Sequence, residues 1–333
     1  MIPLASPWWL PGGHWQTIAA AKLARVGDEA CPIAWNRERW ATPDDDFIDV
    51  DVLPSPSTHA TQANTPCLVL FHGLEGSSAS HYARAFARQA QQRGWTFILP
   101  HFRGCGGTLN RAPRAYHSGD WPEMDWILRR VRAQCSGPLL AAGVSLGGNA
   151  LMRWAGELGT QACARVDALA AICAPLDLVA SGQALGRGLN RLLYTPMFLR
   201  TMKPKAQAKW QQHPGLFDLD RAMQARTLAE FDDAFTAPVH GFRGVMDYWS
   251  RASAKPFLRH IAVPTLLLNA RNDPFVPAAS LPQAVDVGAR VTLSQPAQGG
   301  HVGFVQGTWP GHVNAMPQAV ADWLHRNAEQ ERG

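Results

Sequence analysis

Short apolar runs alternate with amphipathic segments along most of the chain. The apolar runs predict buried strands at 67–71, 95–99, 139–144, 168–173, 264–269 and 290–293. Segments with a helical apolar period predict helices at 79–93, 123–133, 146–158 and 317–329. Strand–helix alternation of this kind predicts an α/β fold, with a mostly parallel sheet that carries helices on both faces.

Three segments depart from this alternation. At 47–53, apolar residues alternate with acidic ones, which predicts an antiparallel edge strand. The stretch at 53–66 is rich in Pro, Ser and Thr and predicts a surface loop. The stretch at 177–255 is helical in composition and contains several prolines. We expect it to form a cap over the strand ends, where ligands bind, inserted into a core made of 1–176 and 256–333.

The composition is that of a globular protein. Of the 333 residues, 46% are apolar and 17% are charged, which excludes a disordered chain. The 31 basic and 26 acidic residues are dispersed, and a net charge of +5 predicts no nucleic-acid partner. No apolar stretch reaches the roughly 18 uninterrupted residues of a membrane span, so no transmembrane helix is expected.

The amino terminus and the cysteines favour a reducing, cytoplasmic location. Residues 1–9 lack a basic segment followed by a continuous apolar one, which is the pattern of a secretory signal. The six cysteines show no C-x-x-C pair and no clustering typical of a metal site. Because Cys67 and Cys173 lie inside apolar runs, we expect them to act as small hydrophobic side chains.

The strongest chemical signal is a serine between an apolar run and a helical segment. The run at 139–144 leads into Gly143-Val144-Ser145-Leu146-Gly147, a G-x-S-x-G sequence. Strand, sharp turn and helix in this order are typical of the nucleophile elbow of α/β-hydrolases, which lifts the serine hydroxyl above the sheet. The glycines of the motif allow neighbouring backbone to pack closely against the turn. Ser145 is therefore the candidate nucleophile.

A serine hydroxyl needs a histidine base, and the histidine needs a carboxylate that fixes its tautomer. In α/β-hydrolases these residues follow the serine in the order acid, then histidine. Asp273 lies 128 residues after Ser145 in a loop that leaves an apolar run, and His301 follows 28 residues later between glycines. Asp177, directly after the preceding run, is a competing acid that otherwise caps a helix. We rank Asp273 first.

Two backbone amides are expected to hold the negatively charged oxygen of the tetrahedral intermediate. One belongs to Leu146, the residue after the nucleophile. The other is assigned to Leu74 in the loop His72-Gly73-Leu74-Glu75-Gly76, where the flanking glycines give the turn its freedom. The alternative for this loop is a plain glycine turn before a helix. We expect His72 to brace the loop and not to act as the base, because it precedes the serine.

The motifs taken together resemble the YheT-like predicted esterases, which are related to the ABHD lipid hydrolases. The resemblance extends over PWWLPGGHWQT at 7–17, HGLEGS at 72–77, HFRGCGG at 101–107, YHSGD at 116–120, GVSLGGN at 143–149, FDD at 231–233, TAP at 236–238, NDP at 272–274 and GGHVGF at 299–304. It implies a mostly parallel eight-stranded sheet flanked by helices, with a helical cap after the sixth strand. It also implies a Ser145, Asp273, His301 triad and carboxylic-ester hydrolysis that needs no metal or organic cofactor.

The expected substrate is a small-molecule or lipid ester, and the acyl length and the oligomeric state are left undefined. An acyltransferase, which passes the acyl group to an alcohol or thiol instead of water, would use the same triad. A haloalkane dehalogenase is disfavoured because its nucleophile is a carboxylate, and a binding protein without activity is expected to have lost a triad member. Neither departure is found here.

The stretch 187–209 leaves a contact with membranes open, although an ordinary cap helix is the favoured interpretation. It contains six basic residues and no acidic one, interleaved with apolar residues. Such a sequence fits either a peripheral helix on an anionic lipid surface or an ordinary cap helix with a solvated basic side. Three tryptophans near the amino terminus, Trp8, Trp9 and Trp15, are expected to pack against the body of the protein.

Overall fold

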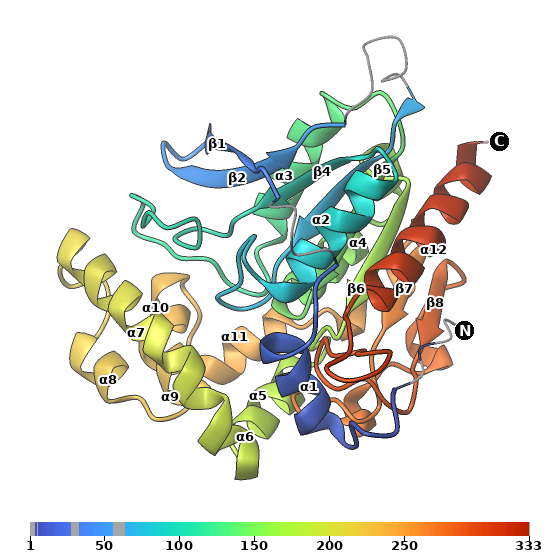
Figure 1. Ribbon diagram of the computed structural model, residues 1–333. Helices are drawn as coiled ribbons and strands as arrows, with labels where there is room; N and C mark the ends of the chain where they lie inside the picture. Colours follow the sequence, from blue (N-terminus) through green and yellow to red (C-terminus); the bar gives the residue numbers. More distant parts are fainter. Residues whose placement is uncertain (1–3, 5, 28–32, 56–63, 333) are drawn as a thin grey trace.

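The computed structural model describes residues 4, 6–27, 33–55 and 64–332, and its centre is an eight-stranded sheet (Figure 1). The strands follow the order β1-β2-β4-β3-β5-β6-β7-β8. The β1–β2 and β2–β4 pairs are antiparallel, and the remaining neighbours pair in parallel. The strands are β1 Asn36–Ala41, β2 Phe47–Leu53, β3 Cys67–Phe71, β4 Thr96–Pro100, β5 Leu139–Val144, β6 Ala168–Ile172, β7 Thr265–Leu268 and β8 Val291–Ser294.

The six strands predicted from apolar runs are confirmed to within one residue at each end. The predicted helices are also present, as α2 His81–Gln92, α3 Trp121–Arg132, α4 Leu146–Leu158 and α12 Ala315–Arg332. Helix α1, Gly13–Lys22, was not predicted because its apolar residues do not gather on one face. Most of the predicted loop at 53–66 lies outside the described residues.

The prediction of 47–53 as an edge strand is wrong. β2 is antiparallel to both neighbours, as predicted, but it lies between β1 and β4, so that β1 forms this edge of the sheet. The acidic residues of β2 are buried because arginines from β1 neutralise them. Arg37 Nε lies 2.7 Å from Asp51 Oδ1, and Arg39 Nε lies 2.8 Å from Asp49 Oδ1. Alternation of apolar and acidic residues therefore belongs here to an inner strand, which is paired with a neighbour on each side.

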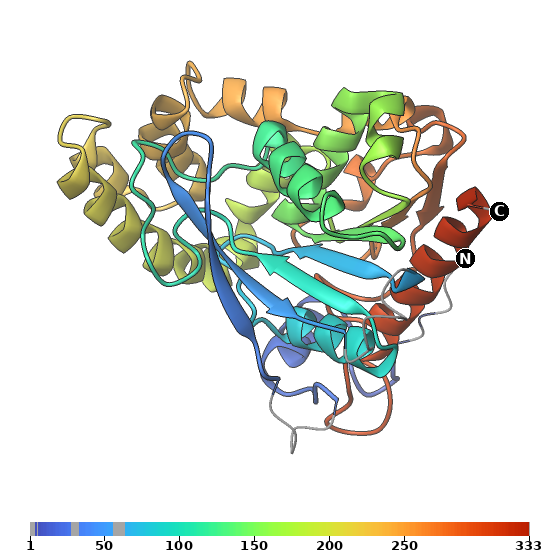
Figure 2. The ribbon, with the colours of Figure 1, turned by 90° about the horizontal axis from the view of Figure 1, so that it is seen from above.

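Alternation along the buried strands divides the core into two layers. In β3, Cys67, Val69 and Phe71 pack with α3 and α4, whereas Leu68 and Leu70 pack with α2 and α12. Figure 2 shows these helix pairs on opposite sides of the sheet. Because side chains of a strand point to alternate faces, an uninterrupted apolar run is what a strand covered on both sides requires.

The segment 177–255, which we call the cap, connects β6 to the strand β7. It contains α5 Leu178–Leu185, α6 Gly188–Leu193, α7 Thr195–Gln212, α8 Leu219–Gln224, α9 Leu228–Phe231, a π-helix at Asp232–Thr236, α10 Ala237–Val239 and α11 Val245–Ala252. Short 3-10 helices lie at Gly159–Ala164, Lys255–His260, Ala278–Ser280 and Ala284–Asp286. Helices α7 to α10 stack beside the sheet (Figure 1) around an apolar cluster of their own, which includes Leu199, Phe217 and Phe231.

The cysteines of the described residues are all free thiols. Cys67 and Cys173 lie in the two core layers, as predicted, and Cys31 lies outside the described residues. Residues 1–3 and 5 of the amino terminus also lie outside them. A search of the described helices finds none with the length and apolar character needed to cross a membrane.

Candidate active site

Ser145 sits at a sharp turn between β5 and α4. Its φ of 53° and ψ of −120° lie in a region that residues with a Cβ rarely adopt. Two backbone hydrogen bonds hold this conformation. The Ser145 N–H donates to the carbonyl oxygen of Ile172 at 2.8 Å, and the Asn149 N–H donates to the carbonyl oxygen of Ser145 at 3.1 Å. The strained turn projects the hydroxyl from the carboxyl end of the sheet, as expected of a nucleophile elbow.

Gly147 allows this elbow to pack against β3. A Cβ added there would lie 2.5 Å from the His72 carbonyl oxygen and 2.6 Å from that of Phe71. We expect Gly147→Ala to lower the free energy of unfolding by about 1–3 kcal/mol, the usual effect of overpacking. Gly186→Ala is the control, because φ there is −79° and the nearest contacts of a new Cβ begin at 3.5 Å. Urea unfolding measures both, and equal effects would contradict the packing argument.

The structure brings Ser145, His301 and Asp273 together in one hydrogen-bonded line. Ser145 Oγ lies 3.0 Å from His301 Nε2, and His301 Nδ1 lies 2.8 Å from Asp273 Oδ2. With the proton on Nδ1 donated to the carboxylate, Nε2 is free to accept from the serine hydroxyl. The arrangement can therefore remove a proton from Ser145 as its oxygen attacks a carbonyl carbon.

Backbone amides fix the Asp273 carboxylate. Its Oδ1 accepts from the Phe275 N–H at 2.7 Å and from the Val276 N–H at 3.3 Å, and the residue is only 5% exposed. The Phe275 ring also lies against the imidazole of His301, with centroids 4.2 Å apart. The second oxygen of the carboxylate is thereby aimed at the His301 ring. The backbone N–H of His301 donates to Thr17 Oγ1 at 2.8 Å, which fixes the residue that carries the ring.

The competing acid, Asp177, caps a helix, which is the structural role expected if it is not the acid of the triad. Its side chain caps α5 by accepting from the Ala180 N–H at 3.0 Å. A carboxylate at a helix N-terminus satisfies one of the free amides there. It makes no hydrogen bond to His301, whose Nδ1 is occupied by Asp273.

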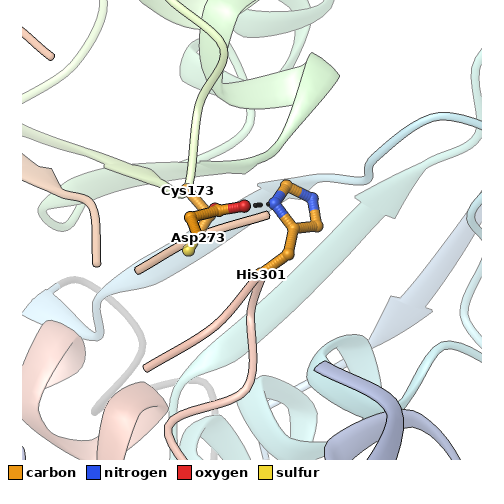
Figure 3. A group of neighbouring side chains, drawn as sticks. All are labelled: Cys173, Asp273 and His301. Atoms are coloured by element: carbon orange, nitrogen blue, oxygen red, sulfur yellow. Dashed lines mark hydrogen bonds and ion pairs between the residues drawn. The ribbon is translucent and has the colours of Figure 1, made fainter. Parts of the chain in front are cut away.

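Cys173 lies directly behind Asp273, which the sequence did not reveal (Figure 3). A ligand atom from each of Cys173, Asp273 and His301 falls within 4.8 Å of the others, and these residue types also bind metals. Here, however, burial raises the pKa of the Cys173 thiol well above its ordinary value, and its sulfur accepts from the Val302 N–H at 3.2 Å. Hydrogen bonds within the protein thus account for all three groups without an ion.

The turn after β3 places a backbone amide beside the serine. A Cβ added to Gly73 would lie 3.2 Å from Ser145 Cβ. The Gly73 N–H donates to the Tyr82 hydroxyl at 2.9 Å, and the Gly76 N–H donates to the Gly73 oxygen at 2.9 Å. Among the described residues, nothing accepts from the Leu74 N–H, and the same holds for Leu146 at the start of α4. Two unpaired amides beside a nucleophile are suited to bind an oxyanion.

His72 braces this turn, as predicted. Its Nδ1 hydrogen donates to the Gly73 oxygen at 2.7 Å, and its Nε2 accepts from the Phe102 N–H at 3.1 Å. Because the ring is fully buried, its pKa falls to about 3, so the imidazole is neutral. Both nitrogens are occupied, which excludes His72 as the base for Ser145.

A cavity of about 1130 Å³, counted out to the open solvent, lies between the sheet and the cap. Ser145 and His301 line it together with both candidate oxyanion residues, Leu74 and Leu146. Most of its wall is apolar and comes from the cap, including Leu178, Leu185, Phe198, Met202, Phe231 and Phe235. A concave site whose accessible wall is mostly apolar is suited to a ligand with hydrocarbon parts.

Comparison with known proteins identifies relatives along nearly the whole chain. A family model described as alpha/beta hydrolase fold matches residues 66–308. The candidate esterase YheT of Escherichia coli (strain K12) is 37% identical over 86% of this chain and 84% of its own length. Phospholipase ABHD3 of Mus musculus is 29% identical over 95% of this chain and 77% of its own length.

Solved structures show the same fold. Mouse alpha/beta hydrolase domain-containing protein 10 superposes with a TM-score of 0.53 at 15% identity, over 87% of this chain and 99% of that one. At this identity the likeness concerns the fold alone. The mostly parallel eight-stranded sheet with flanking helices agrees with it.

Proposed function

Because this chain belongs to the alpha/beta hydrolase family, we propose that it is a serine esterase that cleaves carboxylic esters through an acyl-enzyme on Ser145. The observation that carries the proposal is the line from Ser145 Oγ through His301 to Asp273, with distances of 3.0 and 2.8 Å. Family membership and the similarity to named esterases and phospholipases make the chain a hydrolase. The triad roles and the ester substrate are our inference.

In the first half of the reaction, Ser145 Oγ attacks the ester carbonyl while His301 Nε2 takes the hydroxyl proton. The amides of Leu74 and Leu146 hold the oxyanion. When the intermediate collapses, the bond to the leaving alkoxide breaks and His301 donates the proton to that oxygen. In the second half, His301 takes a proton from water, the hydroxide attacks the acyl-enzyme, and the acid leaves as Ser145 regains its proton.

The cavity favours esters with an apolar acyl or lipid-like part. Its aromatic and aliphatic lining comes mainly from the cap, which we propose is a unit at 177–255 that covers a core of 1–176 and 256–333. The named relative ABHD3 is a phospholipase, which agrees with a lipid ester. Hydrolysis rates for p-nitrophenyl esters from acetate to palmitate test this directly. A preference for acetate, with falling rates as the chain lengthens, would contradict an apolar acyl site.

An acyltransferase remains the second candidate, because the same triad forms the same acyl-enzyme. The two functions differ only in what attacks the acyl-enzyme, water or another alcohol or thiol. Product analysis with added glycerol or ethanol separates them. Free acid as the dominant product at millimolar alcohol supports the esterase, and a transferred ester as the dominant product supports the transferase.

We further propose that one edge of the cap contacts an anionic lipid surface. The helix α6 and the start of α7 expose several apolar side chains beside exposed arginines: Leu189, Leu192, Leu193, Met197, Arg187, Arg191 and Arg200. On α1, the His14 ring stacks against Tyr194, which lies between α6 and α7, with centroids 5.8 Å apart, and the neighbouring Trp15 is exposed. Apolar and basic groups together are what a peripheral membrane surface requires.

The prediction that the amino-terminal tryptophans pack against the body of the protein is wrong for Trp8 and Trp15. Trp8 is 92% exposed and Trp15 is 65% exposed. Trp9 does pack, against an apolar cluster that contains Leu10 and Val305, and its ring meets Trp309 edge-on. The segment is therefore anchored by one tryptophan and presents the other two to solvent.

Co-sedimentation with vesicles that contain anionic phospholipid tests the lipid contact. We expect binding at low salt and weakening as salt is raised, because the arginines supply part of the attraction. Leu192→Glu should reduce binding about tenfold or more, since burial of one leucine contributes roughly 1.5–3 kcal/mol. Val285→Glu is the matched control, because Val285 is 74% exposed and Leu192 72%, and Val285 lies on a different element. No binding at low salt, or equal loss in both variants, would reject the proposal.

A further inference from the structure

The turn that carries Leu74 contains a glutamate where turn chemistry favours glycine. The turn runs from Gly73 to Gly76 and is closed by the Gly76 N–H, which donates to the Gly73 oxygen at 2.9 Å. Glu75 is its third residue and has a φ of 56°. A left-handed third residue in such a turn is normally Gly or Asn, because a larger side chain is strained there. A glutamate at this position therefore needs contacts that hold it.

Tyr116 supplies one pair of these contacts. The Glu75 N–H donates to the Tyr116 hydroxyl at 3.1 Å, and the same hydroxyl donates to Glu75 Oε1 at 2.8 Å. The phenol thus clamps the backbone and the side chain of one residue at once. Its ring is fixed by stacking on Phe102 with centroids 5.4 Å apart.

Lys205 supplies the other contact, and it comes from the cap. From α7, its Nζ lies 3.0 Å from Glu75 Oε1 and 2.9 Å from Oε2. The Glu75 carboxylate is almost entirely buried, so Lys205 is the cation that compensates its charge. The Cys105 sulfur, 3.5 Å from Nζ, does not compete for this role, because burial raises the pKa of that thiol to about 12.

These contacts determine where the Leu74 amide points. The Gly73 oxygen and the Leu74 N–H belong to the same planar peptide group, so closing the turn fixes both. The His72 imidazole and the Gly76 amide hold that oxygen. Keeping Glu75 in its left-handed conformation keeps the turn closed. A lysine of the cap and an amide beside Ser145 are therefore coupled through a single residue.

We propose that Lys205 is a positioning residue for the oxyanion site: its ion pair with Glu75 orients the Leu74 amide, so the site is complete only when the cap is seated. The inference rests on the proposed esterase function, in which Leu74 binds the oxyanion. It assigns the cap a part in the chemical step in addition to lining the cavity. Lys205 itself need not touch the reacting atoms.

Kinetics of Lys205→Met with p-nitrophenyl acetate test this inference. Removing an oxyanion donor outright costs about 10²–10³ in kcat, so a misplaced one should cost about 10- to 100-fold. KM should change by less than threefold, because a short acyl group does not depend on the cap wall. Lys205→Arg, which keeps the cation, should recover most of kcat. Lys203→Met is the matched control: Lys203 lies on the same helix but donates to the Met223 oxygen inside the cap.

A double-mutant cycle with Glu75→Gln separates positioning from general damage to the fold. If Lys205 acts through Glu75, the double variant should be no slower than Glu75→Gln alone. The double variant leaves no buried charge unpaired, so it keeps a folded sample available if Lys205→Met alone unfolds. A double variant with the kcat of the wild type, or a double variant whose loss equals the product of the two single losses, would overturn the proposal. The wild-type protein is measured in parallel. If it hydrolyses the ester and is covalently labelled on Ser145, the esterase function holds whatever the result for Lys205.

Discussion

Ser145→Ala is expected to lower kcat for p-nitrophenyl ester cleavage by roughly 10⁶-fold, the scale seen when a serine nucleophile is removed from a triad. The hydroxyl oxygen is the atom that becomes acylated, and neither His301 nor Asp273 lies in a position to replace it. The variant should also lose covalent labelling by a fluorophosphonate. Its fold should persist, because the backbone hydrogen bonds of the elbow do not involve the hydroxyl.

The control for this change is Ser250→Ala, at an exposed serine on α11. It should retain wild-type turnover and labelling. Unfolding curves for both variants confirm that a loss of activity does not come from a loss of structure. Substantial hydrolysis by folded Ser145→Ala protein would place the nucleophile elsewhere.

Asp273→Asn is expected to reduce turnover about 10³- to 10⁴-fold while the fold is kept. The asparagine oxygen can keep accepting from the Phe275 and Val276 amides, as Asp273 Oδ1 does. Its NH₂ group then faces His301 Nδ1 and donates to it. That nitrogen can no longer carry the proton, which moves to Nε2, the atom that must accept from Ser145. The positions of the three side chains are kept, but His301 carries its proton on the nitrogen that faces Ser145.

Asp177→Asn tests the competing acid under the same conditions. Asparagine caps a helix about as well as aspartate, so α5 and turnover should both be nearly unchanged. Steady-state kinetics of the two variants decide the assignment. If Asp177→Asn fell by orders of magnitude and Asp273→Asn did not, the acid of the triad would be Asp177.

The parts of the fold predicted from the sequence are those with strong local signals. Apolar runs located the parallel strands to within one residue, because both faces of β3 to β7 are covered and β8 packs Val291 and Leu293 against one core layer. The edge strand β1, Asn36–Ala41, gives no such signal, since only Trp40 is buried and its first four residues are polar or charged. Its arginines pair with Asp49 and Asp51 of the neighbouring strand β2, and this pairing is apparent only in the structure.

The candidate site was visible for the same reason. Ser145, Asp273 and His301 each follow an apolar strand, so parallel topology brings their loops to one edge of the sheet. Other contacts between residues that are distant in the sequence were not visible. Cys173 was expected only as a small apolar side chain, and nothing local in the sequence relates it to Asp273.

The basic stretch at 187–209 shows where charge patterns fail. Three of its six cations face the protein and not the solvent. Lys203 donates to the Met223 oxygen, Lys209 donates to the Asn110 oxygen, and Lys205 pairs with Glu75. Buried carbonyl and carboxylate groups can attract a lysine inward, and only the tertiary structure says where those groups lie. The proposed lipid contact therefore rests on the three exposed arginines and their apolar neighbours.

Mass spectrometry of the protein, quenched during turnover of a slowly hydrolysed p-nitrophenyl ester, tests the proposed acyl-enzyme on Ser145. Peptide mapping should find the added acyl mass on the peptide that contains Ser145, and on no other, in amounts that rise and decay with the reaction. An acyl group on a different residue, or steady hydrolysis without any acylated intermediate, would contradict it.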